Sequence, residues 1–254
     1  MADLNKNQIQ KPIVTVENLS FFYDEDKDNP ILKNLSFSLA QGSLTAVIGL
    51  SGCGKTTLCH CLCGIIPNAI NGKLSGDILL NGENISGKSL SVLSQTIGLV
   101  MQNPDDQIVC TTVEDEIAFA LENQMTPPAE IRRRVDEILE FLNITNLQTA
   151  NPAKLSGGQK QLVAIGSVLA LSPQIIIFDE PMSHLDEKGR IMVRATLESL
   201  KAAGKTIIVV EHNFSLIDFA DLWLVMDKGS LAALDTPQNI LAEKNLLSSL
   251  HLDF

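Results

Sequence analysis

A glycine-rich loop after a short apolar run constrains the fold of this chain more than any other feature. The loop spans residues 49–56, with the sequence GLSGCGKT, and it follows the apolar run 44–48. Glycines let a backbone wrap so that successive N–H groups point inward at anionic oxygens, and a following helix adds its positive end. A chance glycine-rich turn would not need this placement between a strand and a helix. The loop therefore predicts a site for the phosphates of a nucleotide.

The lysine of such a loop and the hydroxyl residue after it have separate roles. We expect Lys55 to bridge the β- and γ-phosphates during reaction, and Thr56 to offer its hydroxyl to Mg²⁺. The residues of this loop that we predict to bind the nucleotide are Gly49, Ser51, Gly52, Cys53, Gly54, Lys55, Thr56 and Thr57.

Two carboxylates follow a second apolar run. Residues 175–178 are Ile-Ile-Ile-Phe, and Asp179 and Glu180 come next. Charge at the end of a buried strand is costly unless it is compensated, although apolar strands often end in an acid. Downstream of a phosphate loop the pair predicts that Asp179 serves Mg²⁺ and that Glu180 polarises the attacking water. Together the two features predict a nucleoside-triphosphatase of the phosphate-loop class.

A second candidate anion site lies at residues 155–159, Leu-Ser-Gly-Gly-Gln, at the start of a helical run. Its hydroxyl and free N–H groups stand at a positive helix end. One nucleotide does not need two such sites, so we expect the second to serve the nucleotide of another molecule. The binding residues predicted here are Ser156, Gly157, Gly158 and Gln159.

Residues 155–159 are identical to the signature motif of ABC ATPases, and the chain from about 13 to 237 resembles that family. The resemblance implies that Gln102 reaches Mg²⁺ and the attacking water and that His212 contacts the γ-phosphate. It implies that Tyr23 stacks on adenine, with Phe22 as the alternative. Residues 183–186 resemble the D-loop, but with His184 where a small residue is usual. ATP and Mg²⁺ are the implied cofactors.

The family also implies an architecture that agrees with the hydrophobic pattern. Alternating positions over 13–48 and short apolar runs at 78–80, 96–100, 175–178, 206–210 and 222–226 predict strands. Helical periodicity appears at 113–122, 130–142, 187–202 and 213–220. We expect one α/β domain over 1–254 with a RecA-like core, an N-terminal antiparallel β-subdomain, an inserted helical subdomain at about 104–171 and a short helical tail at about 236–254.

A finer resemblance concerns the partner. Residues 102–107 and 111–119, QNPDDQ and TTVEDEIAF, are similar to ATPases of energy-coupling-factor (ECF) importers of vitamins and transition-metal ions. The resemblance implies an integral membrane coupling protein, a substrate-capture subunit, and pairing with an identical or related ATPase at the cytoplasmic face of the cell membrane. Asp105 and Asp106 either line the groove that takes arginines of the coupling protein or cap the next helix.

Composition limits the alternatives. The formal net charge is -11, which disfavours nucleic acid as a partner because phosphate contacts need clustered cations. A soluble non-transport ABC ATPase remains the alternative, but no long coiled coil separates Lys55 from Leu155. A GTPase would carry an Asn-Lys-x-Asp motif, and the closest sequence, at 5–8, lacks the aspartate.

A group of cysteines and a run of arginines are each explained by the fold without a functional role. The alternating Cys59, Cys61 and Cys63 resemble a metal site only superficially, because side chains two apart on a helix point to different sides. We expect packed, reduced thiols. The basic run 132–134 lies opposite apolar residues of a helical pattern, so we expect a solvated helix face.

Overall fold

The computed structural model describes residues 12–24, 29–213, 216–243 and 247–248. The strands are β1 (Pro12–Tyr23), β2 (Leu32–Ala40), β3 (Leu44–Ile48), β4 (Gly72–Leu80), β5 (Glu83–Asn84), β6 (Ile97–Val100), β7 (Ile175–Asp179), β8 (Thr206–Val210), β9 (Leu222–Asp227) and β10 (Ser230–Asp235). The α-helices are α1 (Lys55–Leu62), α2 (Ile65–Asn68), α3 (Leu90–Leu93), α4 (Val113–Asn123), α5 (Pro128–Phe141), α6 (Gly157–Leu169), α7 (Glu187–Ala202) and α8 (Pro237–Ala242).

The strands form two sheets that match the predicted fold class. One sheet has the order β10-β9-β3-β8-β7-β6, and all its neighbours are parallel except the β10–β9 pair. The other has the order β2-β1-β4-β5 and is antiparallel. The predicted α/β fold with a mostly parallel core sheet and an N-terminal antiparallel sheet is thereby confirmed.

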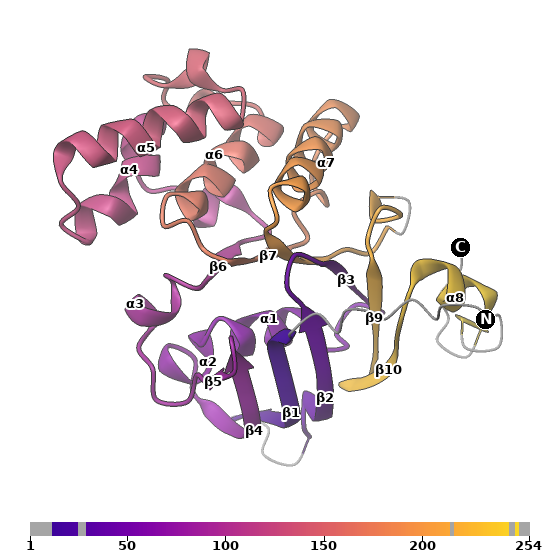
Figure 1. Ribbon diagram of the computed structural model, residues 1–254. Helices are drawn as coiled ribbons and strands as arrows, with labels where there is room; N and C mark the ends of the chain where they lie inside the picture. The colour runs from indigo at the N-terminus through magenta and orange to yellow at the C-terminus, as the bar shows by residue number, and fades with distance from the viewer. Residues whose placement is uncertain (1–11, 25–28, 214–215, 244–246, 249–254) are drawn as a thin grey trace, which may run out of the picture.

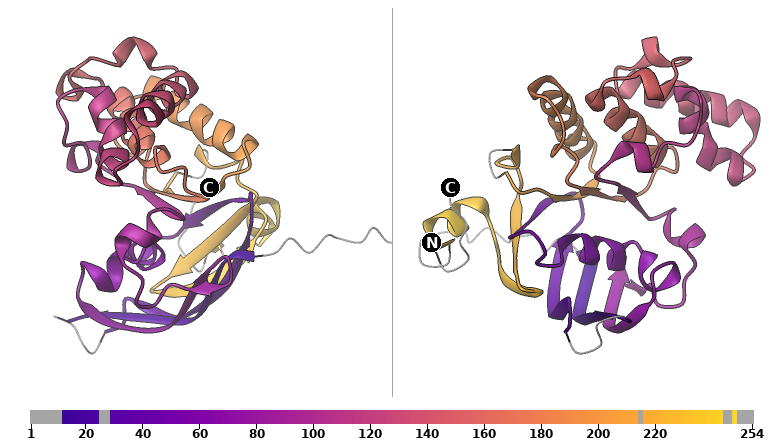
Figure 2. Two further views of the ribbon diagram at one scale, coloured as in Figure 1. Left: turned by 60° about the vertical axis from the view of Figure 1, so that its left-hand side comes forward. Right: turned by 180° about the vertical axis from the view of Figure 1, so that it is seen from behind.

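The parallel sheet is buried on both faces, which explains why its strands are continuously apolar. On β7, Ile176 and Phe178 belong to the core shared with α4 to α7, whereas Ile175 and Ile177 belong to the core shared with α1 and the antiparallel sheet. Successive side chains of a strand point to opposite faces, so one short strand supports two cores. In Figure 1 the helices α4 to α7 lie above the sheet and β1, β2 and β4 lie below it, and the views in Figure 2 agree.

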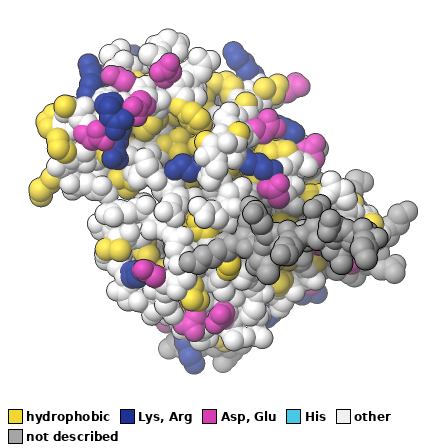
Figure 3. Space-filling view, in the orientation of Figure 1, with side chains coloured by type: hydrophobic (Ala, Val, Ile, Leu, Met, Phe, Trp, Pro, Cys, Tyr) yellow, Lys and Arg dark blue, Asp and Glu magenta, His cyan; other side chains and the backbone are white. Residues whose placement is uncertain are grey.

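The region 104–171 contains α4, α5, α6 and three short 3-10 turns, at Pro104–Asp106, Thr145–Leu147 and Pro152–Lys154. Its apolar side chains belong to the same continuous core as one face of the parallel sheet. Charged side chains of both signs are interspersed over its outer surface in Figure 3.

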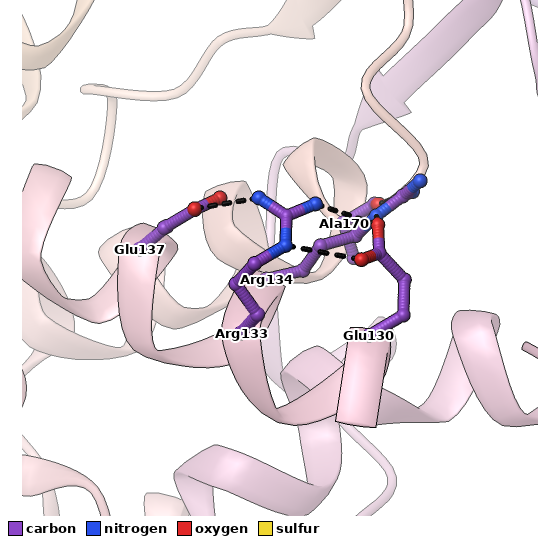
Figure 4. A network of polar contacts seen from close by, with 5 residues as sticks. All are labelled: Glu130, Arg133, Arg134, Glu137 and Ala170. Carbon is purple, nitrogen blue, oxygen red and sulfur yellow. Dashed lines mark hydrogen bonds and ion pairs between the residues drawn. The ribbon is translucent and has the colours of Figure 1, made fainter. Parts of the chain in front are cut away.

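The basic run lies on the exposed side of α5, as predicted. Arg133 bonds Glu130 and Glu137 at 2.6 Å each, and Arg134 bonds Glu130 at 2.7 Å (Figure 4). Arg134 also donates to the carbonyl of Ala170 at the end of α6. The two arginines lower the pKa of Glu130 to about 2. These charges are therefore neutralised within the helical region and do not form a free basic patch.

Two helical predictions need correction or restriction. Of the described residues in 213–220, Leu216 is in a 3-10 turn and 217–219 form a bend and a turn, and none is in an α-helix. Their carbonyls are taken by other elements, since Trp223 donates to Ile217 and Lys201 donates to Phe219. Of the tail at 236–254, α8 covers Pro237–Ala242, and residues 244–246 and 249–254 lie outside the described part.

Candidate functional site

The phosphate loop joins the fully buried β3 to the start of α1. Gly49 has φ 151° and Gly54 has φ 100°. A Cβ on Gly49 would lie 2.4 Å from the carbonyl oxygen of Met226, so only glycine fits the backbone there. Lys55 is 5% exposed, and its ammonium donates to the carbonyls of Gly49 and Leu50 at 2.9 and 3.0 Å. The loop therefore curls around a single buried cation.

Asp179 lies beside this loop at the end of β7. Its side chain is 6% exposed, and burial raises the pKa of its carboxyl, while a hydrogen bond with the Thr56 side chain lowers it. Among the described residues, its Oδ1 atom has no hydrogen-bond partner. A buried carboxylate oxygen without a donor, next to a hydroxyl, fits a site for a hard divalent cation completed by phosphate oxygens.

Three residues meet at the carboxyl edge of the parallel sheet. Gln102, Glu180 and His212 follow β6, β7 and β8, which are neighbours in the sheet. Gln102 Nε2 donates to Glu180 Oε2 at 2.9 Å, and His212 Nε2 pairs with Glu180 Oε1. The structure thus brings Glu180 together with Gln102, 78 positions before it, and His212, 32 positions after it.

The backbone at Glu180 explains its direction. Its φ is 48°, an uncommon left-handed conformation for a residue other than glycine. Its N–H donates to the carbonyl of Val210 at 3.0 Å, and the hydroxyl of Ser183 donates to its carbonyl at 3.0 Å. The chain turns sharply at this residue, and the turn aims the carboxylate at Gln102 and His212.

Tyr23 ends β1 and reaches α1 just after the loop. Its hydroxyl lies 3.1 Å from Thr57 Oγ1, and its ring meets that of Phe21 edge-on at 4.8 Å between centroids. Phe22 points to the opposite face because side chains alternate along a strand. Of the two aromatic candidates for the adenine contact, Tyr23 is therefore the one on the side of α1.

The turn at 155–159 has a different character. Ser156 is the N-cap of α6: its hydroxyl accepts from the N–H of Gln159 at 3.4 Å, and its own N–H donates to Gln159 Oε1 at 3.0 Å. Ser156 and Gly157 are exposed. In the described part of the chain, no hydrogen bond or ion pair links this turn to Lys55, Thr56, Asp179 or Glu180.

The starts of α6 and α7 touch through glycine. A Cβ on Gly158 would lie 2.7 Å from Cα of Gly189, so the two backbones are in direct contact. Asp186 caps α7 by accepting from the N–H of Gly189 at 2.8 Å. His184, the unusual D-loop residue, is exposed.

A groove whose lining includes Gln107, the residue after Asp106, lies beside α4. It has a volume of about 380 Å³ and is lined by apolar residues that include Ile65, Leu90, Leu99, Phe119, Val168 and Leu171. Phe119 is 45% exposed. Asp105 pairs with Lys160 at 2.6 Å. The alternative that these acids cap α4 is wrong, because the cap of α4 is Thr112.

Sequence reasoning passed over Glu211, which directly precedes His212. Its side chain is 2% exposed and accepts from the N–H of Met182 at 3.0 Å. The available clue was an acid at the end of a continuous apolar run, the same pattern that drew attention to Asp179.

The cysteines are all free, and Cys59, Cys61 and Cys63 are buried. Burial raises the pKa of Cys61 and Cys63 to about 12, so these thiols stay protonated. Within the described ranges, no three His, Cys, Asp or Glu side chains gather as a metal-binding group. None of the helices in those ranges is both long and apolar enough to cross a bilayer.

Comparison with known proteins supplies the family. Residues 32–183 match the family described as ABC transporter. The chain is 39% identical over 249 residues to the energy-coupling factor transporter ATP-binding protein EcfA1 of Mycoplasmoides gallisepticum, with 98% of this chain and 85% of that protein covered. It is also 39% identical to EcfA1 of Enterococcus faecalis, with 96% and 86% covered.

Two solved structures are similar to this fold. The structure of cbiO1 from Clostridium perfringens, described as part of the ABC transporter complex cbiONQ, has a TM-score of 0.82 at 32% identity, with 96% of each chain covered. A bacterial Atm1-family ABC exporter with ATP bound has a TM-score of 0.77 at 28% identity, with 99% of this chain and 44% of that chain covered.

Proposed function

The chain belongs to the ABC transporter family of ATPases, and from this premise we propose that it is the ATPase subunit that powers an energy-coupling-factor importer. Its relatives over nearly the whole length bear that name. The relatives and solved structures named above are all described as transporters or their components, which disfavours the alternative of a soluble non-transport ABC ATPase. The observation that supports ATP hydrolysis is the meeting of Gln102, Glu180 and His212 beside a loop that holds a buried lysine, and the assignment to an importer rests on the relatives.

The residues of the site divide the tasks of the proposed reaction among them. Lys55 binds the β- and γ-phosphates of ATP, and Tyr23 packs against the adenine. Glu180 accepts a hydrogen bond from the attacking water and draws its proton, while Gln102 orients that water and His212 donates to the γ-phosphate. Thr56, Asp179 and Gln102 would hold Mg²⁺. Bound Mg²⁺ would supply positive charge that neutralises the phosphate oxygens.

The exposed turn at 155–159 completes the site of another molecule. Two ATPase subunits, identical or related, would lie head to tail, with each ATP between one Lys55 loop and Ser156 of the partner subunit. The exposure of Ser156 and Gly157 supports the proposal, together with the fact that the polar atoms of Ser156 bond only to Gln159 of the same turn. Closing the pair drives the membrane partner, and hydrolysis releases it.

The proposed seat of the membrane coupling protein is the apolar groove beside α4. Its exposed Phe119 offers apolar contact, and Asp105 and Asp106, which precede the lining residue Gln107 in the chain, suit basic side chains of the partner. The chain would work as a peripheral subunit at the cytoplasmic face of the membrane, with a substrate-capture subunit in the same assembly. The net charge of -11 supports a role without nucleic acid.

Glu180→Gln tests the proposed hydrolysis and the pair together. The variant keeps the hydrogen bond to Gln102 but has no basic carboxylate, so ATP should bind while turnover falls about 100-fold or more. With MgATP the variant should accumulate as a dimer in light scattering, whereas with MgADP it should remain a monomer. Normal turnover in a variant that stays monomeric with MgATP would overturn the proposal.

A further inference from the structure

Glu211 is a buried carboxylate for which the proposed reaction has no task. It lies between β8 and His212, and 2% of its side chain is exposed. Burying an acid is costly, so its presence calls for a compensating role. Burial, with the nearby Glu180, raises the pKa of this carboxyl to about 7, whereas the N–H groups of Met182 and His212 and the charge of Arg190 act in the opposite direction.

The contacts of Glu211 join three strand ends. Its own N–H donates to the carbonyl of Val47 on β3, the strand that leads into the phosphate loop, at 3.4 Å. Its carboxylate accepts from the N–H of Met182, two residues after Glu180, at 3.0 Å. It is itself the residue before His212. One side chain therefore ties the segment after β7 to the segment after β8.

A buried glutamate can simply hold a loop in place, and the chain contains such a case. Glu116 is 3% exposed and accepts from the N–H groups of Val109 and Cys110 at 2.9 and 2.8 Å. The loop that Glu116 holds carries none of the reacting groups. The segment that Glu211 holds follows directly on Glu180, whose backbone is in the left-handed conformation.

We propose that Glu211 is a positioning residue for ATP hydrolysis. By accepting the Met182 N–H it fixes the turn at 180–182, and it thereby keeps the Glu180 carboxylate between Gln102 and His212. The inference rests on the roles proposed above for Glu180 and His212. It requires a hydrogen-bond acceptor at position 211 that reaches Met182, and it does not require a negative charge.

The test compares three variants with the wild-type chain. Glu211→Leu removes the acceptor at similar volume, Glu211→Gln keeps it without an ionisable group, and Glu211→Asp keeps the carboxyl but withdraws it by one methylene. For each, kcat and KM for ATP are measured per folded chain, with folding checked by circular dichroism. Asp221→Asn is the control, because Asp221 accepts the N–H of Leu44 at the opposite end of β3.

We expect Glu211→Leu and Glu211→Asp to lower kcat by about 10- to 100-fold, the range that a misplaced reacting group commonly costs, with KM within about twofold. Glu211→Gln should stay within about threefold of wild type, and the control should not change kcat. If Glu211→Leu does not fold, the test rests on whether kcat is lower in Glu211→Asp than in Glu211→Gln.

Several outcomes would overturn the inference. They are wild-type kcat in Glu211→Leu or Glu211→Asp, a Gln variant as slow as the Asp variant, or losses that only follow the folded fraction. Failure of the proposed function itself looks different, since the wild-type chain would then not hydrolyse ATP or Glu180→Gln would be as active as wild type.

Discussion

The loop before α1 and the turn before α6 both place glycines at the start of a helix, but their surroundings differ. At the loop, Lys55 is buried and Asp179, Glu180 and His212 stand close to one another. At the turn, Ser156 is exposed and its polar atoms bond to Gln159. A buried cation can hold phosphates without help, whereas exposed neutral donors add little until a second surface excludes water. Similar glycine patterns can therefore stand in a buried, charged environment and in an exposed, neutral one.

The largest expected effect concerns Lys55. Lys55→Ala removes the buried ammonium, so the affinity of the isolated chain for ATP should fall about 100-fold or more, as when a preorganised charge is lost. Titration with a fluorescent ATP analogue measures the change. Lys88→Ala, which breaks an exposed pair with Glu83, is the matched control. Equal affinity in the two variants would show that the loop does not hold the phosphates.

The stability of the protein should depend on pH through Glu211, which lies at the carboxyl edge of the sheet and not at the turn before α6. The pKa of Glu211 is raised from 4.5 to about 7, so the folded chain binds this proton more tightly than the unfolded chain does. Its contribution to stability is thus full below pH 4.5 and is lost as pH rises towards 7. Glu211→Gln resembles the protonated acid at every pH. Its free energy of unfolding relative to that of wild type should therefore rise over this range by up to about 3 kcal/mol.

Urea unfolding of both proteins between pH 4.5 and 8 measures that difference. Because other carboxylates titrate in both proteins, the informative quantity is the difference between their unfolding free energies at each pH. A gap that stays constant with pH would mean that Glu211 is ionised throughout the range and that burial does not shift its pKa.

The contact between α6 and α7 provides a matched pair of glycines. A Cβ on Gly158 would meet the Gly189 backbone at 2.7 Å, whereas a Cβ on Gly157 would meet only the flexible Leu185 side chain at 3.3 Å. Both changes gain the same helix propensity, so Gly158→Ala should be less stable than Gly157→Ala by about 1–3 kcal/mol. Equal unfolding free energies in urea would contradict the backbone contact.

The smallest effect should come from Ser156. Ser156→Ala removes a neutral hydroxyl worth about 1 kcal/mol, so kcat should fall about tenfold or less. The affinity of the isolated chain for ATP should not change, in contrast to Lys55→Ala. A loss of ATP affinity in the monomer would mean that this turn serves the nucleotide of its own chain.

Much of the site could be predicted because strand order determines it. The apolar runs before Gln102, Glu180 and His212 became β6, β7 and β8, whose carboxyl ends meet at one edge of the sheet. The glycine-rich loop and the N-cap at Ser156 follow from local chemistry and formed as expected. The predicted helices at 113–122, 130–142 and 187–202 correspond to α4, α5 and α7.

What sequence reasoning missed depends on contacts between distant segments. The segment 213–220 has helical periodicity, but Trp223 and Lys201 take its carbonyls. Glu211 looked like an ordinary polar end of a strand, because its partner, the N–H of Met182, lies 29 positions away. The apolar groove beside Phe119 is assembled from six separate stretches of chain and has no linear pattern.

The glycine contact between α6 and α7 has a consequence for how the two ATP sites of the proposed dimer open and close. The start of α6 would grip the ATP bound by the partner subunit, while α7 follows directly on the segment that carries Glu180 of its own site. With two backbones touching at Gly158 and Gly189, neither helix can shift without displacing the other. This contact would couple the two ATP sites of the pair. A movement at one site would be transmitted through α7 and α6 to the other, so that the two sites open and close together.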